Sequence, residues 1–285
     1  MYTIEKKEML NASYVRMSIN APAVAKKAQP GQFIILRDTE DGERIPLTIV
    51  DSDHDAGTVT IIYQIVGVTT RLLGAKEAGD CIADFVGPLG IPTPMEGLKK
   101  VAVVGGGAGC AIAYPVTKAL HDSGVEVHVI AGFRNKDLVI LQEEFKASSN
   151  KYVLVSDDGS TGRKGLVTDV LQDLIESGEK YDEVIAIGPL AMMKVVALLT
   201  KEYGIKTTVS MNPIMIDGTG MCGGCRLSVG GETKFACVDG PDFDGHMVDF
   251  DEAISRLSMY KEQELRHDEQ ICNLLNRQGG SLDAE

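Results

Sequence analysis

The chain has 285 residues, of which 44% are hydrophobic, and a formal net charge of −13. This length accommodates two domains and an appendage, and the acidic charge argues against nucleic-acid binding, which needs a basic surface. No apolar run approaches the roughly 20 residues of a membrane span, and the first residues lack a signal-peptide core, so we expect a cytoplasmic protein without a membrane partner.

The sequence predicts a β domain over residues 1–97. Short apolar or alternating runs are separated by turn dipeptides such as Pro30-Gly31 and Gly87-Pro88. No helical segment longer than about ten residues intervenes, so a closed six-stranded antiparallel barrel is the expected packing. The predicted strands span Tyr2–Glu8, Tyr14–Ile19, Gln32–Leu36, Arg44–Val50, Thr58–Ile65 and Cys81–Phe85.

Residues 98–210 predict an α/β domain, because strands and helices alternate along the segment. This alternation is typical of a parallel sheet covered by helices on both faces, here a five-stranded Rossmann-like sheet. The predicted strands are 101–104, 126–131, 152–156, 183–187 and 207–210, and the helices between them end near Leu120 or span 137–147, 165–177 and 190–203.

A glycine-rich loop lies between the first strand and the first helix of this α/β domain. Its glycines are Gly105, Gly106, Gly107 and Gly109, and Cys110 occupies the place of the third glycine of the G-x-G-x-x-G pattern. Such a loop presents a helix N-terminus and close backbone to a pyrophosphate. We therefore expect a nucleotide site here, against the alternative of a tight turn that binds nothing.

Two further loops are predicted at the same edge of the sheet, where ligands gather in open α/β folds. One contains Gly188 and Pro189, and the other contains Asp158, for which an ordinary polar turn is an equal alternative. Arg134 follows the second strand and could meet a 2′-phosphate, so these residues alone do not separate NADH from NADPH.

In the β domain, the segment Arg44–Thr48 places a guanidinium ahead of a hydroxyl on one strand. Arginine suits a diphosphate through bidentate charge-assisted bonds, and the Thr48 hydroxyl could bond a flavin ring nitrogen. The alternative for Arg44 is a surface arginine on an edge strand.

The segment after the fifth predicted strand offers a second phosphate contact. The backbone N–H groups around Gly67 and Thr69, with the hydroxyl of Thr70, could meet a phosphate as backbone nests do. Tyr63 either lines the same cleft or fills a face of the barrel.

Three cysteines near residue 230 have the spacing of metal ligands. Cys222, Cys225 and Cys237 follow Asp217 in a glycine-rich stretch, which fits the plant-type [2Fe–2S] pattern C-x4-C-x2-C with aspartate in the first position. A Cys3His zinc site that includes His246 is the alternative. We interpret Cys81 and Cys110 as buried thiols.

The C-terminal part divides into a cluster segment, 211–245, and a helical tail, 246–285. Residues 249 to about 277 predict a helix, for which Asp251 is a suitable N-cap and Glu252 lies in the first turn.

The order of these parts resembles the ferredoxin–NADP reductase superfamily. The turn at Pro30–Phe33, the segment Gly87–Gly90 and the segment Ile187–Met193 match that superfamily as well. The resemblance spans residues 1 to 245 and implies that Arg44, Pro46, Leu47, Thr48, Tyr63, Gly67, Thr69 and Thr70 bind FAD.

Two groups of electron-transfer subunits within the superfamily resemble the chain. One serves NAD-dependent dihydroorotate dehydrogenase and usually has four cluster cysteines. The other is the small subunit of NADH-dependent reduced ferredoxin:NADP oxidoreductase, which has aspartate and three cysteines, so Asp217 favours this second group. The chain departs from the superfamily at Leu47, where an aromatic residue is common, and at Ile112, where relatives have proline.

The resemblance implies a flavoprotein that exchanges hydride with NAD(H) and single electrons with a larger subunit through a [2Fe–2S] cluster. That larger iron–sulfur flavoprotein would form a heterodimer with this chain and connect it to ferredoxin in an electron-bifurcating oxidoreductase. We expect no residue of this chain to act as an acid–base catalyst. The alternatives are a dihydroorotate dehydrogenase subunit and a zinc-stabilised nucleotide-binding module without turnover.

Overall fold

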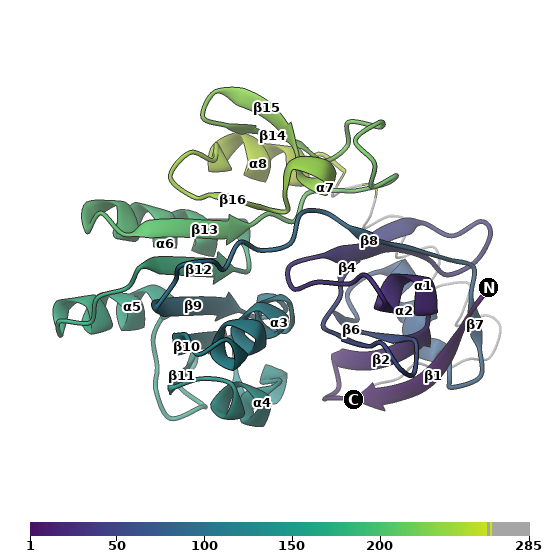
Figure 1. Ribbon diagram of the computed structural model, residues 1–285, viewed down its shortest axis with the longest axis horizontal. Helices are drawn as coiled ribbons and strands as arrows, with labels where there is room; N and C mark the ends of the chain where they lie inside the picture. Colours follow the sequence, from purple (N-terminus) through teal and green to yellow (C-terminus); the bar gives the residue numbers. More distant parts are fainter. Residues whose placement is uncertain (261–262, 264–285) are drawn as a thin grey trace.

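Two antiparallel sheets enclose the core of the N-terminal part in the computed structural model, which describes residues 1–260 and 263 (Figure 1). One sheet has the order β5-β6-β2-β1-β7 and the other has the order β4-β3-β8. Their strands are β1 (Tyr2–Met9), β2 (Tyr14–Asn20), β3 (Phe33–Arg37), β4 (Arg44–Thr48), β5 (Asp51–Asp53), β6 (Thr58–Gln64), β7 (Cys81–Ile82) and β8 (Asp84–Leu89), with the short helices α1 (Pro22–Ala25) and α2 (Val68–Ala75).

The six predicted strands of this part are all present. The segments 44–53 and 81–89 each form two strands, because each segment passes from one sheet to the other. After β4, the N–H of Ile49 bonds to Gln32, whereas the N–H of Val50 bonds to Thr60 on β6. The segment 81–89 likewise pairs first with β1 and then with β3. Strands that change sheet make the corners of a closed β structure, so the predicted antiparallel barrel is confirmed in this form.

Strand β3 is buried on both faces. Ile34 and Leu36 point into the barrel core, and Phe33 and Ile35 belong to a second core shared with the rest of the chain. Successive side chains of a strand point to opposite faces, so β3 forms a wall between the barrel and its neighbours.

The second part contains a parallel sheet in the order β11-β10-β9-β12-β13, which confirms the predicted α/β fold. Helices lie on both faces of this sheet (Figure 1). The elements are β9 (Lys100–Gly106), α3 (Gly109–Asp122), β10 (Glu126–Phe133), α4 (Gln142–Ala147), β11 (Lys151–Ser156), α5 (Val167–Glu176), β12 (Glu183–Ile187), α6 (Leu190–Glu202) and β13 (Lys206–Ser210).

The helix predicted over 137–147 is shorter in the structure. A 3-10 turn, η1 (Lys136–Leu138), precedes α4, and Leu141 between them has a left-handed backbone with φ of 57°. A left-handed residue cannot continue a right-handed helix, so α4 begins at Gln142.

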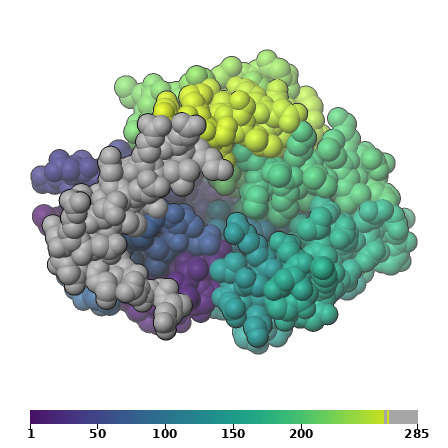
Figure 2. Space-filling view, turned by 180° about the vertical axis from the view of Figure 1, so that it is seen from behind, coloured from purple at the N-terminus to yellow at the C-terminus, as the bar shows by residue number. Residues whose placement is uncertain are grey.

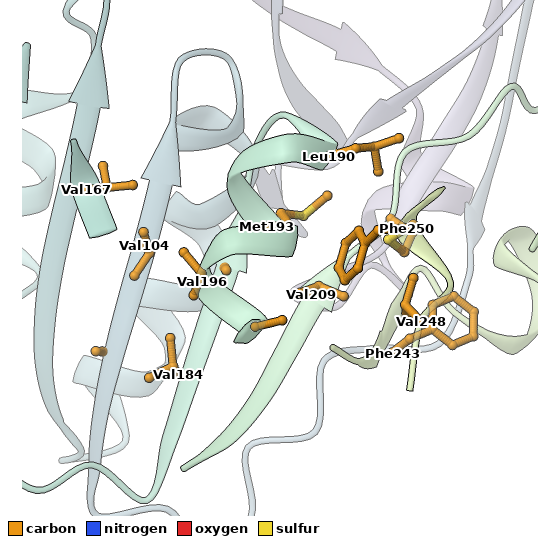
Figure 3. Packing of buried hydrophobic residues seen from close by; sticks show 14 of the residues in the cluster. Val104, Val167, Val184, Leu190, Met193, Val196, Val209, Phe243, Val248 and Phe250 are labelled. Carbon is orange, nitrogen blue, oxygen red and sulfur yellow. The ribbon is translucent and has the colours of Figure 1, made fainter. Parts of the chain in front are cut away.

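The C-terminal segment packs on the parallel sheet instead of standing apart. It contains β14 (Arg226–Val229), β15 (Glu232–Phe235), α7 (Ala236–Asp239), β16 (Asp242–Asp244) and α8 (Phe250–Leu257). Strand β16 pairs antiparallel with β13 and adds a sixth strand to the sheet. Figure 3 shows Phe243, Val248 and Phe250 beside Val209 and Met193, and Figure 2 shows this segment and α8 lying over the α/β part.

Helix α8 begins where the sequence predicts a helix, but its N-cap is not the predicted Asp251. Asp249 is the N-cap, and its side chain accepts a hydrogen bond from the N–H of Glu252. The remainder of the helix predicted to residue 277, together with Cys272, lies outside the described residues. Within the residues that are described, no helix combines the length and the apolar character that crossing a membrane requires.

A charged network ties together the starts of the parallel strands. Lys100 Nζ lies 2.8 Å from Glu126 Oε1 and 2.5 Å from Glu179 Oε2. His128 is 4% exposed and bonds through Nδ1 to the Tyr181 hydroxyl at 2.9 Å and through Nε2 to Glu126 at 3.0 Å. Burial lowers the pKa of His128, and the nearby Lys100 ammonium acts in the same direction.

The buried imidazole makes the stability of the fold pH-dependent. The unfolded chain takes up a proton at His128 as the pH falls through about 6.5, while the folded chain resists it. The stability that depends on neutral His128 is therefore present above that pH and is lost progressively down to the lower folded pKa. We expect thermal unfolding curves from pH 7.5 to 5 to show a smaller acid-induced fall for His128→Gln than for the wild type.

The exposed residue His54 provides the matched control, because His54→Gln removes an imidazole that is already in solvent. Its acid-induced fall is expected to equal that of the wild type. An equal fall in wild type and His128→Gln would contradict the assignment of the pH dependence to His128.

Candidate functional site

A cavity of about 580 Å³ opens at the carboxyl ends of the parallel strands. Both predicted glycine loops border it, and helices α3 and α6 begin there. The start of a helix offers unpaired N–H groups and the positive end of its dipole to an anion. The lining includes Tyr14, Gln64, Gly106, Gly107, Gly109, Ile112, Arg134, Asp157, Gly188, Pro189, Met192, Ser210 and Asn212.

The glycines of the first loop permit three close approaches. A side chain at Gly109 would overlap the Ile187 carbonyl oxygen, and one at Gly106 would come within 2.5 Å of the Met192 sulfur. Gly105 makes room for the Cys110 sulfur, which would lie 2.8 Å from a Cβ at that position. Gly109 thus provides the close helix–strand approach, which explains why a cysteine is tolerated in the place of the third glycine.

The third predicted loop reaches the cavity through a different aspartate from the one expected. Asp157 lines the cavity, whereas Asp158 is exposed and accepts hydrogen bonds from the N–H and hydroxyl of Ser160. These Ser160 bonds lower the pKa of Asp158. Asp158 therefore has the geometry of a polar turn, the alternative that the sequence left open.

Sequence reasoning missed several polar residues of the cavity, among them Tyr14, Gln64 and Asn212. Asn212 follows β13 at the carboxyl edge of the sheet, a position that could have indicated it. Tyr14 and Gln64 come from the barrel, where they are direct partners at one end of the β2–β6 pairing. Nothing in the local sequence of β2 or β6 indicates that these strands border an α/β cavity.

The residues of the predicted flavin strand β4 point to two different faces. Arg44, Pro46 and Thr48 pair with Arg37, Ile35 and Phe33, so they lie on the outer face of the barrel wall. Leu47 points the other way and packs against the barrel core. A leucine in place of an aromatic residue is therefore accommodated as a core side chain.

Tyr63 fills the barrel core instead of lining a cleft. Its side chain is 4% exposed and packs with the barrel cluster. Its hydroxyl is buried, and the structure places no hydrogen-bond partner on it among the described residues. Burial raises the pKa of this hydroxyl, with the Asp38 carboxylate adding to the effect.

Gly67, Thr69 and Thr70 form the start of helix α2. The Thr70 hydroxyl oxygen accepts hydrogen bonds from the N–H groups of Val66 and Gly67, both at 3.0 Å. Thr69 donates its hydroxyl to Glu43 at 2.7 Å. A side chain at Gly67 would meet no atom of the described residues within 4 Å, so these residues leave space for a ligand over this helix start. An exposed helix N-terminus fits the phosphate groups of FAD.

Two of the three clustered cysteines are brought together by a β-hairpin. Cys225 directly precedes β14, Cys237 lies two residues after the end of β15 on α7, and Arg226 pairs with Phe235 across the hairpin. Their sulfurs are 3.3 Å apart and both side chains are buried. Burial raises the pKa of the Cys237 thiol to about 12. A buried pair of thiolates needs a cation beside it, and an iron cluster supplies that charge.

Cys222 and Asp217 lie on the exposed side of the same loop. Asp217 accepts backbone hydrogen bonds from Thr219 at 3.0 Å on Oδ1, and from Met221 at 3.1 Å and Cys222 at 2.8 Å on Oδ2. These N–H groups lower the pKa of the Asp217 carboxyl, which favours the charged carboxylate. The same hydrogen bonds hold the loop from Thr219 to Cys222 around the Asp217 side chain. An oxygen donor and three sulfurs on one loop system form a donor set suited to a [2Fe–2S] cluster.

His246 points away from these cysteines. Its Nε2 lies 3.1 Å from the Thr200 hydroxyl on α6, and its backbone N–H bonds to Asp244. The fourth ligand of the alternative Cys3His zinc site is therefore engaged elsewhere. Each of the five cysteines in the described part of the chain is a free thiol. Cys110 is buried as predicted, but the prediction of a buried Cys81 is wrong, because this side chain lies at an exposed position of β7.

Comparison with protein families gives two matches that coincide with these sites. Residues 103–197 match the oxidoreductase NAD-binding domain, which covers most of the lining of the 580 Å³ cavity. Residues 212–249 match the iron–sulfur cluster binding domain of dihydroorotate dehydrogenase B, which includes all three clustered cysteines.

Individual proteins are similar over nearly the whole chain. A Thermotoga maritima protein described as a dihydroorotate dehydrogenase B (NAD(+)) electron transfer subunit homolog is 49% identical, covering 86% of each chain. The electron transfer subunit of dihydroorotate dehydrogenase B from Geobacillus thermodenitrificans is 34% identical over 85% of this chain and 95% of its own.

A solved structure is similar as well. It is a chain of the NADH-dependent reduced ferredoxin-NADP oxidoreductase, studied for insights into flavin-based electron bifurcation. The solved chain superposes on the present one with a TM-score of 0.90, and the two sequences are 44% identical. The match covers 95% of the present chain and 98% of the solved chain. The resemblance to this group, the fold class and the three cofactors FAD, [2Fe–2S] and NAD(H) are thereby confirmed. The chain belongs to the family of dihydroorotate dehydrogenase B-type electron-transfer subunits, oxidoreductase components of the ferredoxin–NADP reductase superfamily.

Proposed function

We propose that this chain is the NAD(H)-linked small subunit of an electron-bifurcating NADH-dependent ferredoxin:NADP oxidoreductase. It would act in the cytoplasm as a heterodimer with a larger iron–sulfur flavoprotein, through which ferredoxin is reached. Asp217 carries this choice, because it stands where relatives of the other group have a fourth cysteine. The 44% identity to a chain of the oxidoreductase structure supports the same choice.

We divide the chain into an FAD-binding barrel (1–97), an NAD-binding domain (98–210), a cluster segment (211–245) and a tail (246–285). Gly67, Thr69 and Thr70 would hold FAD phosphate at the start of α2, with Pro46, Leu47, Thr48 and Tyr63 in and beside the flavin strand. When bound, FAD exchanges electron pairs with NAD(H) and single electrons with an iron–sulfur centre. Asp217, Cys222, Cys225 and Cys237 would ligate the [2Fe–2S] cluster.

In the nucleotide cavity, Gly105, Gly106, Gly107 and Gly109 would let the dinucleotide pyrophosphate approach the start of α3. Gly188 and Pro189 border the opposite wall. Asp158 was the aspartate expected from the sequence, and the cavity geometry favours its neighbour Asp157. We expect that no titratable group of this chain needs to move a proton in this scheme.

A second candidate function is the electron-transfer subunit of a dihydroorotate dehydrogenase. The names of several relatives favour it, at 34% identity for the Geobacillus protein. The feature that argues against this second candidate is the aspartate at position 217, where the dihydroorotate dehydrogenase subunits usually have a cysteine.

The identity of the partner subunit separates the two candidates. We expect the chain, isolated from its native cells by a mild affinity step, to bring with it a larger subunit that contains iron, sulfide and its own flavin. The complex should reduce ferredoxin when supplied with NADPH and NAD. Isolation with a flavoprotein that oxidises dihydroorotate would contradict the proposal and establish the second candidate.

The cluster assignment makes a prediction about the buried cysteine pair. Cys225→Ser should lose most of the iron and acid-labile sulfide, together with the electron paramagnetic resonance signal of the reduced cluster, because a buried hydroxyl is a poor ligand for iron. Asp217→Cys should keep a cluster with a changed signal. Cys81→Ser is the matched control and should retain the full content of iron and sulfide. Stoichiometric zinc without iron in the wild type would exclude the cluster.

The nucleotide assignment makes a prediction about Gly109. Gly109→Ala puts a methyl group against the Ile187 carbonyl and must displace the start of α3. We expect NADH affinity to fall about fivefold or more, since overpacking of this kind costs about 1–3 kcal/mol. Calorimetry with NADH measures the effect, and Ala147→Ser, at an exposed position of α4 outside the cavity lining, should bind like the wild type. Unchanged NADH affinity in Gly109→Ala would place the nucleotide elsewhere.

A further inference from the structure

Arg44 lies in a row of charged residues across the three-stranded sheet. Arg37 on β3 pairs with Arg44 on β4 and with Asp84 on β8. Arg37 Nε donates to Asp84 Oδ2 at 2.6 Å, and Arg44 Nη1 lies 3.5 Å from the same oxygen. One carboxylate therefore restrains both guanidinium groups on the outer face of the barrel.

The Arg44 side chain reaches from this row to the cluster segment. Its Nε donates to the carbonyl oxygen of Ile216 at 2.6 Å, although the two residues are 172 positions apart. Ile216 directly precedes Asp217, and its own side chain is 49% exposed. Burial of the isoleucine therefore contributes little to holding this part of the loop, and the bond to the charged guanidinium is the stronger restraint.

A second contact holds the loop on the other side of Asp217. Gly218 has φ of +78°, and a Cβ there would come within 2.6 Å of Leu89 Cδ1 and 3.1 Å of Ile35 Cγ1. Leu89 and Ile35 belong to β8 and β3, in the same sheet as Arg44. The residues before and after Asp217 thus both contact the outer face of one barrel sheet.

We propose that Arg44 is a positioning residue for the cluster loop. Anchored by Asp84, its guanidinium fixes the Ile216 carbonyl and hence the place of Asp217 relative to β4, the strand that also carries Thr48. The inference rests on the proposed function only in taking Asp217 as a cluster ligand. It gives Arg44 a different role from the FAD diphosphate contact expected from the sequence, because Nε and Nη1 already face the carbonyl and the carboxylate.

The test uses Arg44→Gln in the purified full-length protein with its natural cofactors. Hydrogen–deuterium exchange of the peptide that covers residues 216–222 should be about tenfold faster than in the wild type, since the lost bond has a charged donor. The electron paramagnetic resonance signal of the reduced cluster should shift or broaden. Arg44→Lys, which keeps the charge but lacks the planar Nε–H donor, should change both readouts in the same direction.

Arg37→Gln is the matched control, because it removes the same charge from the same row and the same contact with Asp84 without touching the loop. Its loop exchange and resonance signal should equal those of the wild type. Faster exchange in Arg44→Gln supports the proposal whether or not FAD content also falls.

Two results would overturn the proposal. One is wild-type loop exchange in Arg44→Gln, and a simultaneous loss of FAD would then assign Arg44 to the diphosphate. The other is equal acceleration in Arg37→Gln and Arg44→Gln. A wild-type protein without iron would instead refute the proposed function, and the exchange comparison would still decide the role of Arg44 in the loop.

Discussion

The double burial of β3 is the constraint on which the arrangement of the sites depends. Its even-numbered residues Ile34 and Leu36 complete the barrel core, and its odd-numbered residues Phe33 and Ile35 complete the core that includes the cluster segment. A strand with two apolar faces cannot slip by one residue without exchanging these two sets. The register of β3 therefore fixes β4, with the flavin motif, against the loop that carries Asp217.

Much of this organisation could be predicted from local patterns. The six strands of the barrel and the five parallel strands follow from apolar periodicity and turn dipeptides, and the structure contains all of them. The hairpin that joins Cys225 to Cys237 agrees with the spacing of ligands around one centre. These features depend on residues close in sequence, which is why a single sequence reveals them.

Contacts between distant segments were beyond such reasoning. Arg44 looked like a phosphate ligand because its strand suggested a flavin motif, and its bond to Ile216 depends on how two domains pack. Leu47 and Tyr63 face the barrel core because of the strand register, which local sequence does not specify. Which of Asp157 and Asp158 lines the cavity depends on the turn in which Ser160 bonds to Asp158. A shift of one residue in a polar loop is not visible in the sequence.

The pairing of β16 with β13 has a consequence for how the chain can be divided. An open parallel sheet ends in a strand with unpaired backbone groups, which can recruit other chains. Here the segment that follows the cysteines covers that edge, and Phe243 and Val248 cover apolar side chains next to it. The cluster segment thus also protects the edge of the sheet in the nucleotide-binding domain. A shortened chain that ends after β13 would lose the cluster segment and, with it, the strand that protects the sheet edge against aggregation.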